Sequence, residues 1–513
     1  MRKQILFILS TFALLMYPLS LSAQDSTAGD QALAPDFDGN GTVDFADFLA
    51  FAGQFGSRQG DGRYDARYDL DGDGEIGFSD FLIFSSSFGK SDDEVALVAI
   101  PDANLRAVIE DSLSKASGAP ITRDEMATLT RLRARNANIR DLTGLEFATR
   151  LILLDFGDEI VEGRYANSNS ISDLSPLSDL TNLIYLNLSG NRISDLTPLS
   201  GMTNLTYLNL SRNRLMDLTP LSGLTSLKWL FLTDNNILDI TPLSGMTNLG
   251  LLLLYNNSIS DVTPLSDMTS LERLYLHNNS ISDVTPLSGL TSLERLYLHN
   301  NSISNVTPLS GLTNLERLYL YSNRISDITP LSGLTNLTYL RLNYNYITDL
   351  TPLSGLTNLT YLRLSFNPNI SDATPLSGLT NLTALYLTRT SISDAAFLSG
   401  LTNLITLSLA RTSISDLKSL SGLTNLTNLA VYRNSSITDL TPLSGLTRLN
   451  TLVLYANSIS DLSPLVANTG LDTGDLVDLR GNPLSTISYR THIPALQDRG
   501  VVVRSGSTWR PDN

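Results

Sequence analysis

Apolar residues recur along most of the chain with a fixed spacing of 22 positions. The segment 205–226 is one such unit: it has leucines in the pattern Leu-x-x-Leu-x-Leu, then an Asn, then a further apolar position, then Thr-Pro-Leu-Ser. The Asn recurs from Asn191 to Asn367 in unbroken steps of 22. Repetition this strict predicts a solenoid, in which a single coil cannot bury its own apolar face and therefore stacks on its neighbours.

Each unit predicts one short strand and one return segment. In Leu-x-Leu the alternate residues point to opposite faces, so Leu208 and Leu210 face the core while their neighbours face solvent. The Asn side chain carries both a carbonyl and an NH₂ group, which can bond backbone groups left unpaired where the chain turns. The proline of Thr-Pro-Leu-Ser fixes φ and ends the strand. We expect about sixteen coils over residues 129–484, with a curved parallel sheet on the concave face.

The beginning of the chain departs from this pattern. Arg2 and Lys3 precede an apolar run that ends in small residues before Ala23. This order is typical of a cleaved export signal over residues 1–23, and the run is shorter than the roughly 20 residues that an uncleaved membrane anchor needs. We expect an exported chain without a membrane span and a linker over 24–34.

The two ends of the array need covers, because an exposed solenoid end would leave its last apolar layer in water. We expect a helical N-terminal cap over residues 99–128. We expect a C-terminal cap and tail over 485–513, in which a closing coil and a terminal helix cover the last layer.

Composition excludes several classes of protein. The 513 residues carry 35 basic and 51 acidic side chains, a formal net charge of -16, and no cysteine. Without cysteine the chain has no disulfide framework, thiolate metal site or thiol nucleophile. Its acidic balance disfavours general binding to nucleic acid or to anionic membranes.

Most of the negative charge lies in residues 36–94, where twelve Asp and two Glu face three Arg and one Lys. Two twelve-residue loops stand there, with Gly at position 6 and oxygen-bearing groups at the positions that a calcium loop uses. A water is expected at Gly77. The expected ligands of two Ca²⁺ ions are Asp36, Asp38, Asn40, the carbonyl of Thr42, Asp44 and Asp47 in the first loop, and Asp69, Asp71, Asp73, the carbonyl of Glu75 and Asp80 in the second.

We expect residues 35–90 to form a small all-α module around these loops, followed by a linker over 91–98. An apolar segment with phenylalanines follows each loop, and two short amphipathic helices would bury those rings against each other. The alternative, an acidic disordered linker, would lack this positional regularity and the aromatic residues. Mg²⁺ fits less well than Ca²⁺, because it demands tighter octahedral geometry.

Outward strand positions carry the information about a ligand, since the core leucines repeat for packing reasons. Adjacent coils place aromatic, Arg and apolar residues there, which is the composition of binding hot spots. One hypothesis is that the concave face binds a protein or glycan. The alternative is that aromatic ladders merely stabilise the sheet and were copied by repeat duplication. The candidate ligand-binding residues are Tyr207, Trp229, Phe231, Leu251, Leu253, Tyr255, Arg273, Tyr275, His277, Arg295, Tyr297, His299, Arg317, Tyr319, Tyr321, Tyr339, Arg341, Tyr361 and Arg363.

Two local features qualify this picture. His277 and His299 occupy the same place in neighbouring coils, but two histidines without a third ligand make a poor metal site. Thr390 and Thr412 replace the Asn in two consecutive coils. We expect a local change of curvature there.

Two family resemblances rest on these motifs. The 22-residue coil with its Asp-Leu/Ile-Thr-Pro-Leu signature, preceded by a helical segment, resembles the internalin-like group of bacterial leucine-rich repeat proteins. The duplicated calcium loop, with Asp at position 12 and one helix after each loop, resembles a dockerin module, which implies docking to a cohesin domain of a scaffold or surface protein. Where dockerins often carry a polar recognition pair, this chain has Phe45-Ala46 and Phe78-Ser79.

These features predict a secreted or cell-surface binding or adhesion protein rather than an enzyme. In this hypothesis the concave face of the repeats binds a ligand while the calcium-loaded module docks to a scaffold or surface. The tail beyond Leu484 is too short for a catalytic domain. Two alternatives remain: a non-catalytic component of an extracellular polysaccharide-degrading complex, or a structural surface spacer without a ligand.

Overall fold

The computed structural model describes residues 35–90, 96–158, 160–161, 164–165 and 169–506. The expected export signal and the linker over 24–34 lie outside the described residues, as do residues 91–95 of the second expected linker. The chain forms two compact units, Met1–Leu205 and Thr206–Asn513. In the part of the chain described, no helix has both the length and the apolar character needed to cross a membrane.

A small helical module occupies the start of the first unit. Helices α2 (Phe45–Gln54) and α3 (Phe78–Ser87) each begin where an acidic loop ends, and the 3₁₀ turn η1 (Ala66–Tyr68) lies between them. The rings of Phe51 and Phe84 stack with their centroids 5.3 Å apart, and both are buried. These rings stand at equivalent positions of the two sequence copies, so the duplication builds a shared core from both halves.

Backbone hydrogen bonds close this module on itself. The Val43 N–H donates to the Lys90 carbonyl, and the Gly89 N–H donates to the Val43 carbonyl, each at 2.7 Å. In the second copy the Ile76 N–H donates to the Ser57 carbonyl at 2.9 Å. Each loop is therefore tied to the segment that follows the helix of the other copy.

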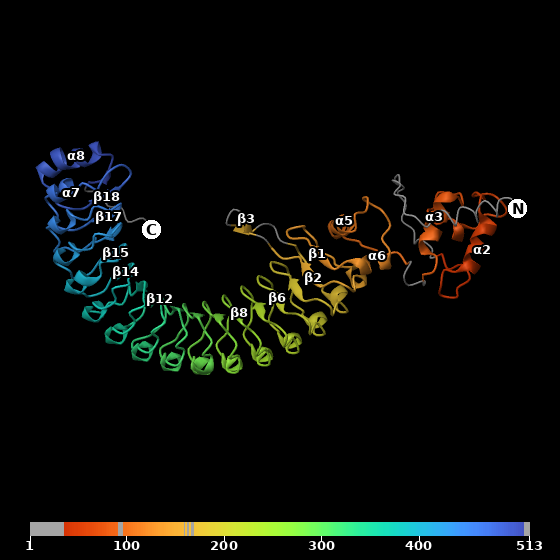
Figure 1. The fold of residues 1–513 in the computed structure, drawn as a ribbon, viewed down its shortest axis with the longest axis horizontal. Coiled ribbons are helices and arrows are strands. Elements are labelled where there is room, and N and C mark those ends of the chain that lie inside the picture. The colour runs from red at the N-terminus through yellow and green to blue at the C-terminus, as the bar shows by residue number, and fades with distance from the viewer. Residues whose placement is uncertain (1–34, 91–95, 159, 162–163, 166–168, 507–513) are drawn as a thin grey trace. The chain divides into compact units, whose positions relative to one another are not determined.

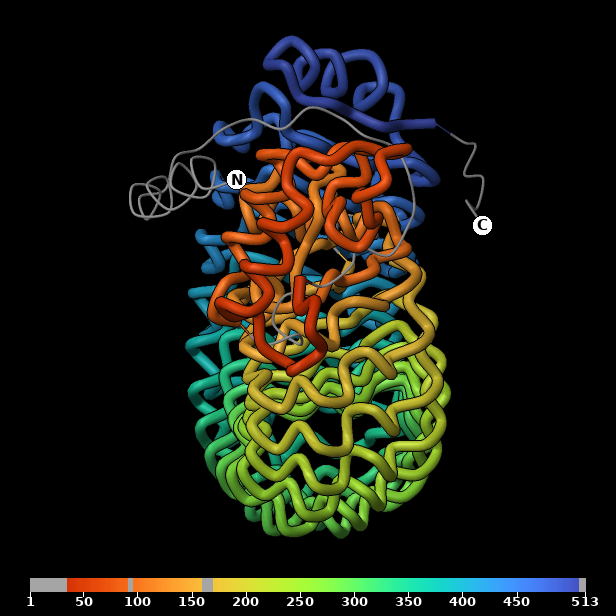
Figure 2. The backbone as a smooth tube through the Cα atoms, turned by 90° about the vertical axis from the view of Figure 1, so that its right-hand side faces the viewer, coloured from red at the N-terminus to blue at the C-terminus, as the bar shows by residue number. Residues whose placement is uncertain are grey.

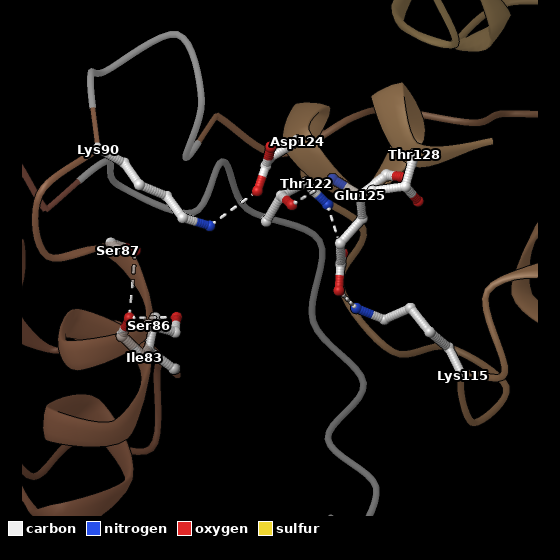
Figure 3. A network of polar contacts seen from close by, with 9 residues as sticks. All are labelled: Ile83, Ser86, Ser87, Lys90, Lys115, Thr122, Asp124, Glu125 and Thr128. Carbon is white, nitrogen blue, oxygen red and sulfur yellow. Dashed lines mark hydrogen bonds and ion pairs between the residues drawn. The ribbon is translucent and has the colours of Figure 1, made fainter. Parts of the chain in front are cut away.

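Two further helices precede the repeats, in the region where a cap is expected: α5 (Ala103–Ser112) and α6 (Arg123–Thr128). Leu105, Ile109 and Met126 are fully buried beneath them. Figure 3 shows how α6 begins: the Glu125 N–H donates to the Thr122 hydroxyl, and the Glu125 carboxylate accepts from the Thr122 N–H at 2.9 Å. This reciprocal capping box satisfies two backbone donors that the first turn leaves unpaired.

Ion pairs surround the same helix. Lys115 reaches the Glu125 carboxylate at 2.5 Å, and Lys90 reaches Asp124 at 3.0 Å (Figure 3). The Lys90–Asp124 pair is exposed on both sides, so it contributes on the order of 0–1 kcal/mol.

The first unit contains the beginning of the array. Strands β1 (Arg131–Arg133), β2 (Leu153–Asp155) and β5 (Tyr185–Asn187) are parallel. The 3₁₀ turns η2 (Leu145–Phe147) and η3 (Ser175–Leu177) return the chain between them, and η4 (Thr197–Leu199) follows β5. A two-residue antiparallel ladder, β3 (Ile160–Val161) with β4 (Arg164–Tyr165), stands in an insertion that lengthens one coil.

The second unit is a continuous run of coils, visible as an arc in Figure 1 and as stacked loops in Figure 2. Figure 1 shows the strands on the inner, concave side of this arc and the 3₁₀ turns on the outer side. The parallel strands are β6 (Tyr207–Asn209), β7 (Trp229–Phe231), β8 (Leu251–Leu253), β9 (Arg273–Tyr275), β10 (Arg295–Tyr297), β11 (Arg317–Tyr319), β12 (Tyr339–Arg341), β13 (Tyr361–Arg363), β14 (Ala384–Tyr386), β15 (Thr406–Ser408), β16 (Asn428–Ala430), β17 (Thr451–Val453), β18 (Leu476–Asp478) and β19 (Val502–Arg504).

Turns of the 3₁₀ type begin at the Thr-Pro-Leu sequence in most coils. The carboxylate of the preceding Asp accepts a hydrogen bond from the Thr N–H, as Asp217 does from Thr219 at 2.8 Å. The turns are η5 (Thr219–Leu221), η6 (Thr241–Leu243), η7 (Thr263–Leu265), η8 (Thr285–Gly289), η9 (Thr307–Leu309), η10 (Thr329–Leu331), η11 (Thr351–Leu353), η12 (Thr374–Leu376), η13 (Ala396–Gly400), η14 (Lys418–Leu420) and η15 (Thr441–Leu443).

The register of the sheet follows the sequence period. Leu274 pairs with Leu296 and Leu296 with Leu318, so each core leucine lies beside its counterpart in the next coil. Leu208 and Leu210 are both fully buried, and the predicted alternation of core-facing and outward residues is confirmed. The leucine-rich repeat solenoid and its parallel sheet are likewise confirmed.

The Asn of each coil joins neighbouring coils. Asn323 donates from Nδ2 to the Leu320 carbonyl of its own coil at 3.1 Å and to the Leu298 carbonyl of the preceding coil at 3.0 Å. Its Oδ1 accepts from the Ile303 N–H at 3.0 Å. One buried amide therefore satisfies three backbone groups that the turn leaves without partners.

Threonine cannot reproduce this arrangement. The hydroxyl of Thr390 donates to the Leu387 carbonyl of its own coil at 2.8 Å, and the hydroxyl of Thr412 donates to the Leu409 carbonyl at 2.9 Å. A hydroxyl has one proton to donate, so the donation to the preceding coil is lost in both places. The change of curvature expected at these coils stays a prediction.

The C-terminal end contains one strand more than expected. Helix α7 (Ser463–Ala467), the π-helical turn η16 (Ser488–His492) and α8 (Ile493–Asp498) follow the last 3₁₀ turn, and Ile493 and Leu496 are buried. Strand β19 then pairs with β18 in parallel, with Val503 opposite Val477. The sequence pattern missed β19 because its Val-Val-Arg has neither the Leu-x-Leu spacing nor a following Asn.

Replacing Asn323 with Ala should destabilise the array by about 2–4 kcal/mol, because the change leaves three buried backbone groups unsatisfied. Thr390→Ala is the matched control, since it removes a single side-chain bond and should cost about 1 kcal/mol. Urea unfolding followed by circular dichroism measures both. Equal losses in the two variants would contradict the role assigned to the Asn.

Candidate functional site

The outward strand positions of β6 to β13 form columns that run across successive coils. Arg273, Arg295 and Arg317 are neighbours in one column, and Tyr275, Tyr297 and Tyr319 are neighbours in the next. Runs of one residue type form in a column because the register sets every residue beside its counterpart 22 positions later, and the sequence repeats that residue in successive coils. The predicted ligand-binding residues all lie on these strands or directly after them.

Aromatic rings in these columns stack face to face. The ring centroids of Tyr275 and Tyr297 are 4.3 Å apart, and those of Tyr297 and Tyr319 are also 4.3 Å apart. Tyr339 and Tyr361 stack at 4.0 Å. Burial in the stack raises the pKa of the Tyr275 and Tyr339 hydroxyls, so both remain protonated and able to donate hydrogen bonds at neutral pH.

A second stack stands where β8 to β11 end. Tyr255, His277, His299 and Tyr321 stack in that order, with centroids 4.3, 4.2 and 4.1 Å apart. Burial lowers the pKa of His277 to about 4 and that of His299 to about 3, so both imidazoles are neutral at physiological pH. Among the described residues no cluster of three or more metal-ligating side chains includes either histidine.

These two stacks line a hollow of about 460 Å³ in the concave face. Leu251 and Leu253 on β8 form its apolar end. Every residue that lines it belongs to the set expected from the sequence: Leu251, Leu253, Tyr255, Arg273, Tyr275, His277, Tyr297, His299, Tyr319 and Tyr321.

The arginines of this face lie against the aromatic rings. The Arg341 guanidinium carbon is 4.7 Å from the centre of the Tyr321 ring, and that of Arg363 is 5.3 Å from the Tyr386 ring. The Nε–H groups of Arg273, Arg295, Arg341 and Arg363 are buried without a hydrogen-bond partner. In the described part of the chain none of these four forms an ion pair with a carboxylate.

Trp229 and Tyr207 extend the face toward β6. Trp229 is 46% exposed, and its ring meets Tyr207 edge-on with centroids 6.4 Å apart. Tyr207 also lies beside Phe231, at 5.1 Å. This end of the face offers aromatic surface to a partner rather than burying it.

A second hollow, of about 310 Å³, includes Arg363 but otherwise lies beyond the residues expected from the sequence. Small side chains on β15 to β17 line it, together with Phe366, Tyr386 and Tyr432. The predicted set ended at Arg363 because the Arg and Tyr columns end there. Continuing each column to Tyr386 and Tyr432 would have found this region.

The first acidic loop gathers three of its expected calcium ligands. Carboxylate oxygens of Asp36, Asp38 and Asp47 lie within 4.8 Å of one another. The N–H groups of Gly39 and Gly41 donate to the Asp36 carboxylate at 2.9 and 2.7 Å. The loop therefore wraps around its first residue, as a cation-binding loop must.

Not every expected ligand joins this cluster. Asp44 accepts from the Ala46 N–H at 2.7 Å and so caps α2. Asp47 is buried, and its carboxylate accepts from the N–H groups of Phe37 at 2.6 Å and of Asp44 at 2.8 Å. Asn40 donates from its amide to Asp38 and Asp44 at 3.2 and 3.3 Å.

The second loop is built the same way. Carboxylate oxygens of Asp69, Asp71 and Asp73 lie within 4.8 Å of one another, while Asp80 stands apart from this cluster and accepts from the N–H groups of Leu70 and Gly77, both at 2.6 Å. The position-6 glycines, Gly41 and Gly74, have φ of 86° and 85°, a conformation that disfavours any residue with a Cβ.

The surroundings of its two carboxylate oxygens show that the Asp69 side chain points toward the inside of the second loop. Its Oδ2 accepts from the Tyr64 hydroxyl at 2.6 Å, and this bond raises the pKa of Tyr64 to about 12. Its Oδ1 is buried without a hydrogen-bond partner. A buried, unpaired carboxylate oxygen beside two further carboxylates fits a site for a cation with oxygen ligands.

The expected ligands Thr42 and Glu75 act through their backbone carbonyls in the sequence hypothesis. The Glu75 side chain pairs with Arg58 at 2.9 Å across the short antiparallel bridge that joins the segment after α2 to the second loop.

The sequence reasoning missed an exposed apolar surface on the helical module. Phe45 and Leu49 on α2 are 57% and 58% exposed, and their counterparts Phe78 and Leu82 on α3 are 55% and 44% exposed. Large apolar side chains that stay in water at matching positions of both copies indicate an interaction surface. The sequence did contain a signal for this surface. Phe45 and Phe78 stand at the same position of the two loops, where dockerins often carry a polar pair.

The repeats match a known sequence family, and the family model for leucine-rich repeats in two copies matches overlapping windows from 165–201 to 335–378. The crystal structure of the internalin inlF from Listeria monocytogenes is 35% identical, covering 64% of this chain and 95% of inlF with a TM-score of 0.61. The chain belongs to the leucine-rich repeat family. No curated protein matches it.

Two further solved structures are similar to this leucine-rich repeat protein. The functional domain of InlJ from Listeria monocytogenes is 27% identical, covering 74% of this chain and 80% of that domain with a TM-score of 0.54. A leucine-rich repeat protein of Leptospira interrogans is 23% identical, covering 74% of this chain and 97% of its own with a TM-score of 0.67, which shows the fold alone.

The similarity to internalins bears on the class of activity. Leucine-rich repeat proteins of the internalin type mediate protein binding and are surface or secreted proteins, and such repeat folds are typically non-catalytic. The matches indicate no enzymatic family.

The histidine stack makes the stability of this leucine-rich repeat protein dependent on pH. Burial lowers the pKa of His277 and His299 from 6.5 in the unfolded chain to about 4 and about 3 in the folded one. Below pH 6.5 the unfolded chain therefore binds protons that the folded chain does not, and the free energy of unfolding falls as the pH is lowered to about pH 3.

A His277→Phe/His299→Phe variant keeps two flat rings in the stack but cannot titrate. Between about pH 7 and about pH 4.5 the wild type should lose on the order of 2–4 kcal/mol more than this variant. Urea midpoints at the two pH values measure the difference. An equal loss in both proteins would show that the carboxylates alone account for the pH dependence.

Proposed function

We propose that this protein is a secreted or cell-surface binding protein that holds a protein ligand on the concave face of its repeats while its helical module, loaded with two Ca²⁺ ions, docks it to a scaffold or surface. The observation that carries the proposal is the hollow on β8 to β11, where two aromatic stacks, an apolar end and the Arg273 side chain meet. Tyr, Trp and Arg in one place are the residues that dominate binding energy at protein interfaces.

Aromatic stacking alone does not account for this face. A ladder that served only the sheet would have no need of Arg273, Arg341 and Arg363, whose Nε–H groups are buried without partners. Burying a donor without a partner costs on the order of 1–3 kcal/mol. A bound ligand that supplies acceptors would remove that cost, which favours a ligand over a purely structural spacer.

The calcium part of the proposal rests on the acidic loops. Three carboxylates within 4.8 Å of one another in each loop repel unless a cation lies among them. Asp36, Asp38 and Asp47 would hold one ion together with Asn40, Asp44 and the Thr42 carbonyl. Asp69, Asp71, Asp73 and the Glu75 carbonyl would hold the other, with Asp80 at the last position of the loop.

Docking of the module is assigned to its exposed apolar residues. Phe45 and Leu49 on α2 and Phe78 and Leu82 on α3 stand in water at equivalent places, next to the loops that Ca²⁺ would order. An apolar patch of this kind suits a folded scaffold domain of the cohesin type with an apolar surface of its own.

Calorimetric titration of the full chain with Ca²⁺ should give two binding events. An Asp36→Asn/Asp38→Asn variant should retain one, and an Asp69→Asn/Asp71→Asn variant should retain the other, because each pair removes two anionic ligands from one loop. Asp65→Asn is the control, since Asp65 pairs with Arg67 outside both loops. Two binding events in all of the variants would contradict the ligand assignment.

The concave face is tested by substitutions on its strands, with a control at exposed apolar residues elsewhere in the repeats. Trp229→Ala/Tyr275→Ala/Tyr297→Ala should weaken capture of the protein ligand by at least about 100-fold, since hot-spot truncations cost roughly 2 kcal/mol or more each. Met216→Ala/Leu238→Ala removes exposed apolar residues outside the strands and should leave capture unchanged.

The ligand for this test is first isolated from extracellular proteins with the full chain and then purified for measurement of its affinity. Circular dichroism checks that each variant is folded. Undiminished affinity in the triple variant would contradict binding at the concave face.

A further inference from the structure

Arginines follow a diagonal line across the concave face of the second unit. Arg273, Arg295 and Arg317 stand at the first position of β9, β10 and β11. Arg341 and Arg363 stand at the third position of β12 and β13. Between β11 and β12 the line therefore shifts by two residues along the strand direction.

The line continues after the strands. Arg389, Arg411 and Arg433 occupy the same place in the three following coils, at the turn where φ is positive: 58°, 53° and 56°. A positive φ disfavours residues other than Gly and Asn. In the earlier coils of this unit the same turn carries Arg212, Asp234, Asn256, Asn278, Asn300, Ser322, Tyr344 and Phe366. Arginine in three successive coils at this turn is not what the local backbone favours.

Side chains in this turn column reach the concave face. Phe366, which precedes Arg389 in the column, lines the second hollow, and the Arg389 guanidinium carbon lies 4.9 Å from its ring centre. From β9 to the coil of Arg433 each coil carries one arginine of the line, eight in succession. Seven steps at the strand spacing give a track of roughly 34 Å along the sheet.

Seven of the eight track arginines form no ion pair with a carboxylate in the part of the chain that the structure describes. In the described residues, Arg273, Arg295 and Arg317 form no ion pair, and the same holds for Arg341, Arg363, Arg389 and Arg411. The chain as a whole has a formal net charge of -16, so the absence of acidic partners here does not reflect a shortage of acidic residues.

We infer that this track binds an extended acidic segment of a polypeptide, with a large apolar side chain at one end. The inference rests on the proposed ligand-binding role of the concave face and specifies the chemistry of the ligand. A segment of about ten residues in extended conformation spans the track. Arginine in every coil, rather than lysine, matches carboxylates with two parallel hydrogen bonds.

The apolar end distinguishes a polypeptide from an anionic polysaccharide. The track begins at Arg273 beside the hollow that Leu251 and Leu253 close, and that hollow of about 460 Å³ has room for a large side chain. A sulfated polysaccharide offers charge along the track but no apolar group for the hollow.

Fluorescence anisotropy with labelled peptides tests the inference on the full chain. The probe has five Glu-Ser repeats with Trp-Gly at one end, and a second probe carries Trp at the other end; in the neutral probe Gln replaces Glu. The acidic peptide should bind in at least one orientation, more tightly than the neutral one by tenfold or more, and added salt should weaken it. A peptide that binds equally well with Gln in place of Glu would overturn the inference.

Variants locate the binding on the track. Arg295→Gln/Arg341→Gln/Arg411→Gln should weaken the acidic peptide at least about tenfold. The matched control, Arg192→Gln/Arg214→Gln/Arg324→Gln, makes the same change in net charge at three exposed arginines outside the line and should stay within about twofold of wild type. Equal weakening of peptide binding in both triple variants would show that the effect depends only on net charge, and it would overturn the inference.

A heparin-derived oligosaccharide tests whether the track binds an anionic polysaccharide instead of a polypeptide. If it binds through the track arginines and the acidic peptides do not, the ligand is an anionic polysaccharide and the inference fails.

The affinity of the purified protein ligand distinguishes failure of this inference from failure of the proposed function. If that ligand loses affinity with the Trp229, Tyr275 and Tyr297 variant but not with the track variant, the concave face binds its ligand and only the acidic chemistry is wrong.

Discussion

The array depends on a buried amide that connects each coil to the one before it. A coil of 22 residues has a strand of only three residues, and its turn leaves backbone groups that no regular ladder can satisfy. The side chain of Asn323 donates to a carbonyl of its own coil and to one of the preceding coil, and accepts an N–H as well. Because these groups are buried, leaving one of them without a hydrogen-bond partner would cost about 1–3 kcal/mol.

This connection also fixes what the concave face can display. Over β6 to β13 the coils share one register, so a residue lies beside its counterpart 22 positions later and repeated residues become continuous columns. Flat rings are stabilised by this arrangement because they stack face to face, as the 4.2 Å between the ring centroids of His277 and His299 shows. Like charges do not: two guanidinium groups at the strand spacing of about 4.8 Å repel by about 1 kcal/mol in water. Three arginines in a column are therefore a cost to folding, and a ligand with carboxylates is the natural compensation.

The period of the sequence was sufficient to predict the solenoid, the burial of residues such as Leu208 and Leu210, and the columns of outward residues. What it could not predict depends on contacts that do not repeat. Strand β19 forms only because α8 returns the chain beside β18, and no Leu-x-Leu marks it. The stacking of Tyr339 on Tyr361 and the unpaired Nε–H of Arg363 depend on side-chain conformations. The same residues could adopt other conformations, so the sequence alone does not specify these contacts. The loop spacing predicted the cluster of Asp36, Asp38 and Asp47, but not that Asp47 would also accept hydrogen bonds from three backbone N–H groups.

Net charge is a poor guide to the ligand of such a protein. Electrostatic interactions between exposed groups fade beyond about 8 Å at physiological ionic strength, so a ligand on β9 to β13 responds to the charges within one or two coils. Those coils carry arginines on the concave face, whereas the Asp residues of the array, such as Asp217, stand at the start of the 3₁₀ turns on the outer side of the arc. The concave-face arginines and the Asp residues that begin the 3₁₀ turns therefore lie on opposite sides of one thin layer. A chain with a formal charge of -16 can therefore present a cationic surface to its partner, and the sign of that surface follows from which positions of the repeat the arginines occupy.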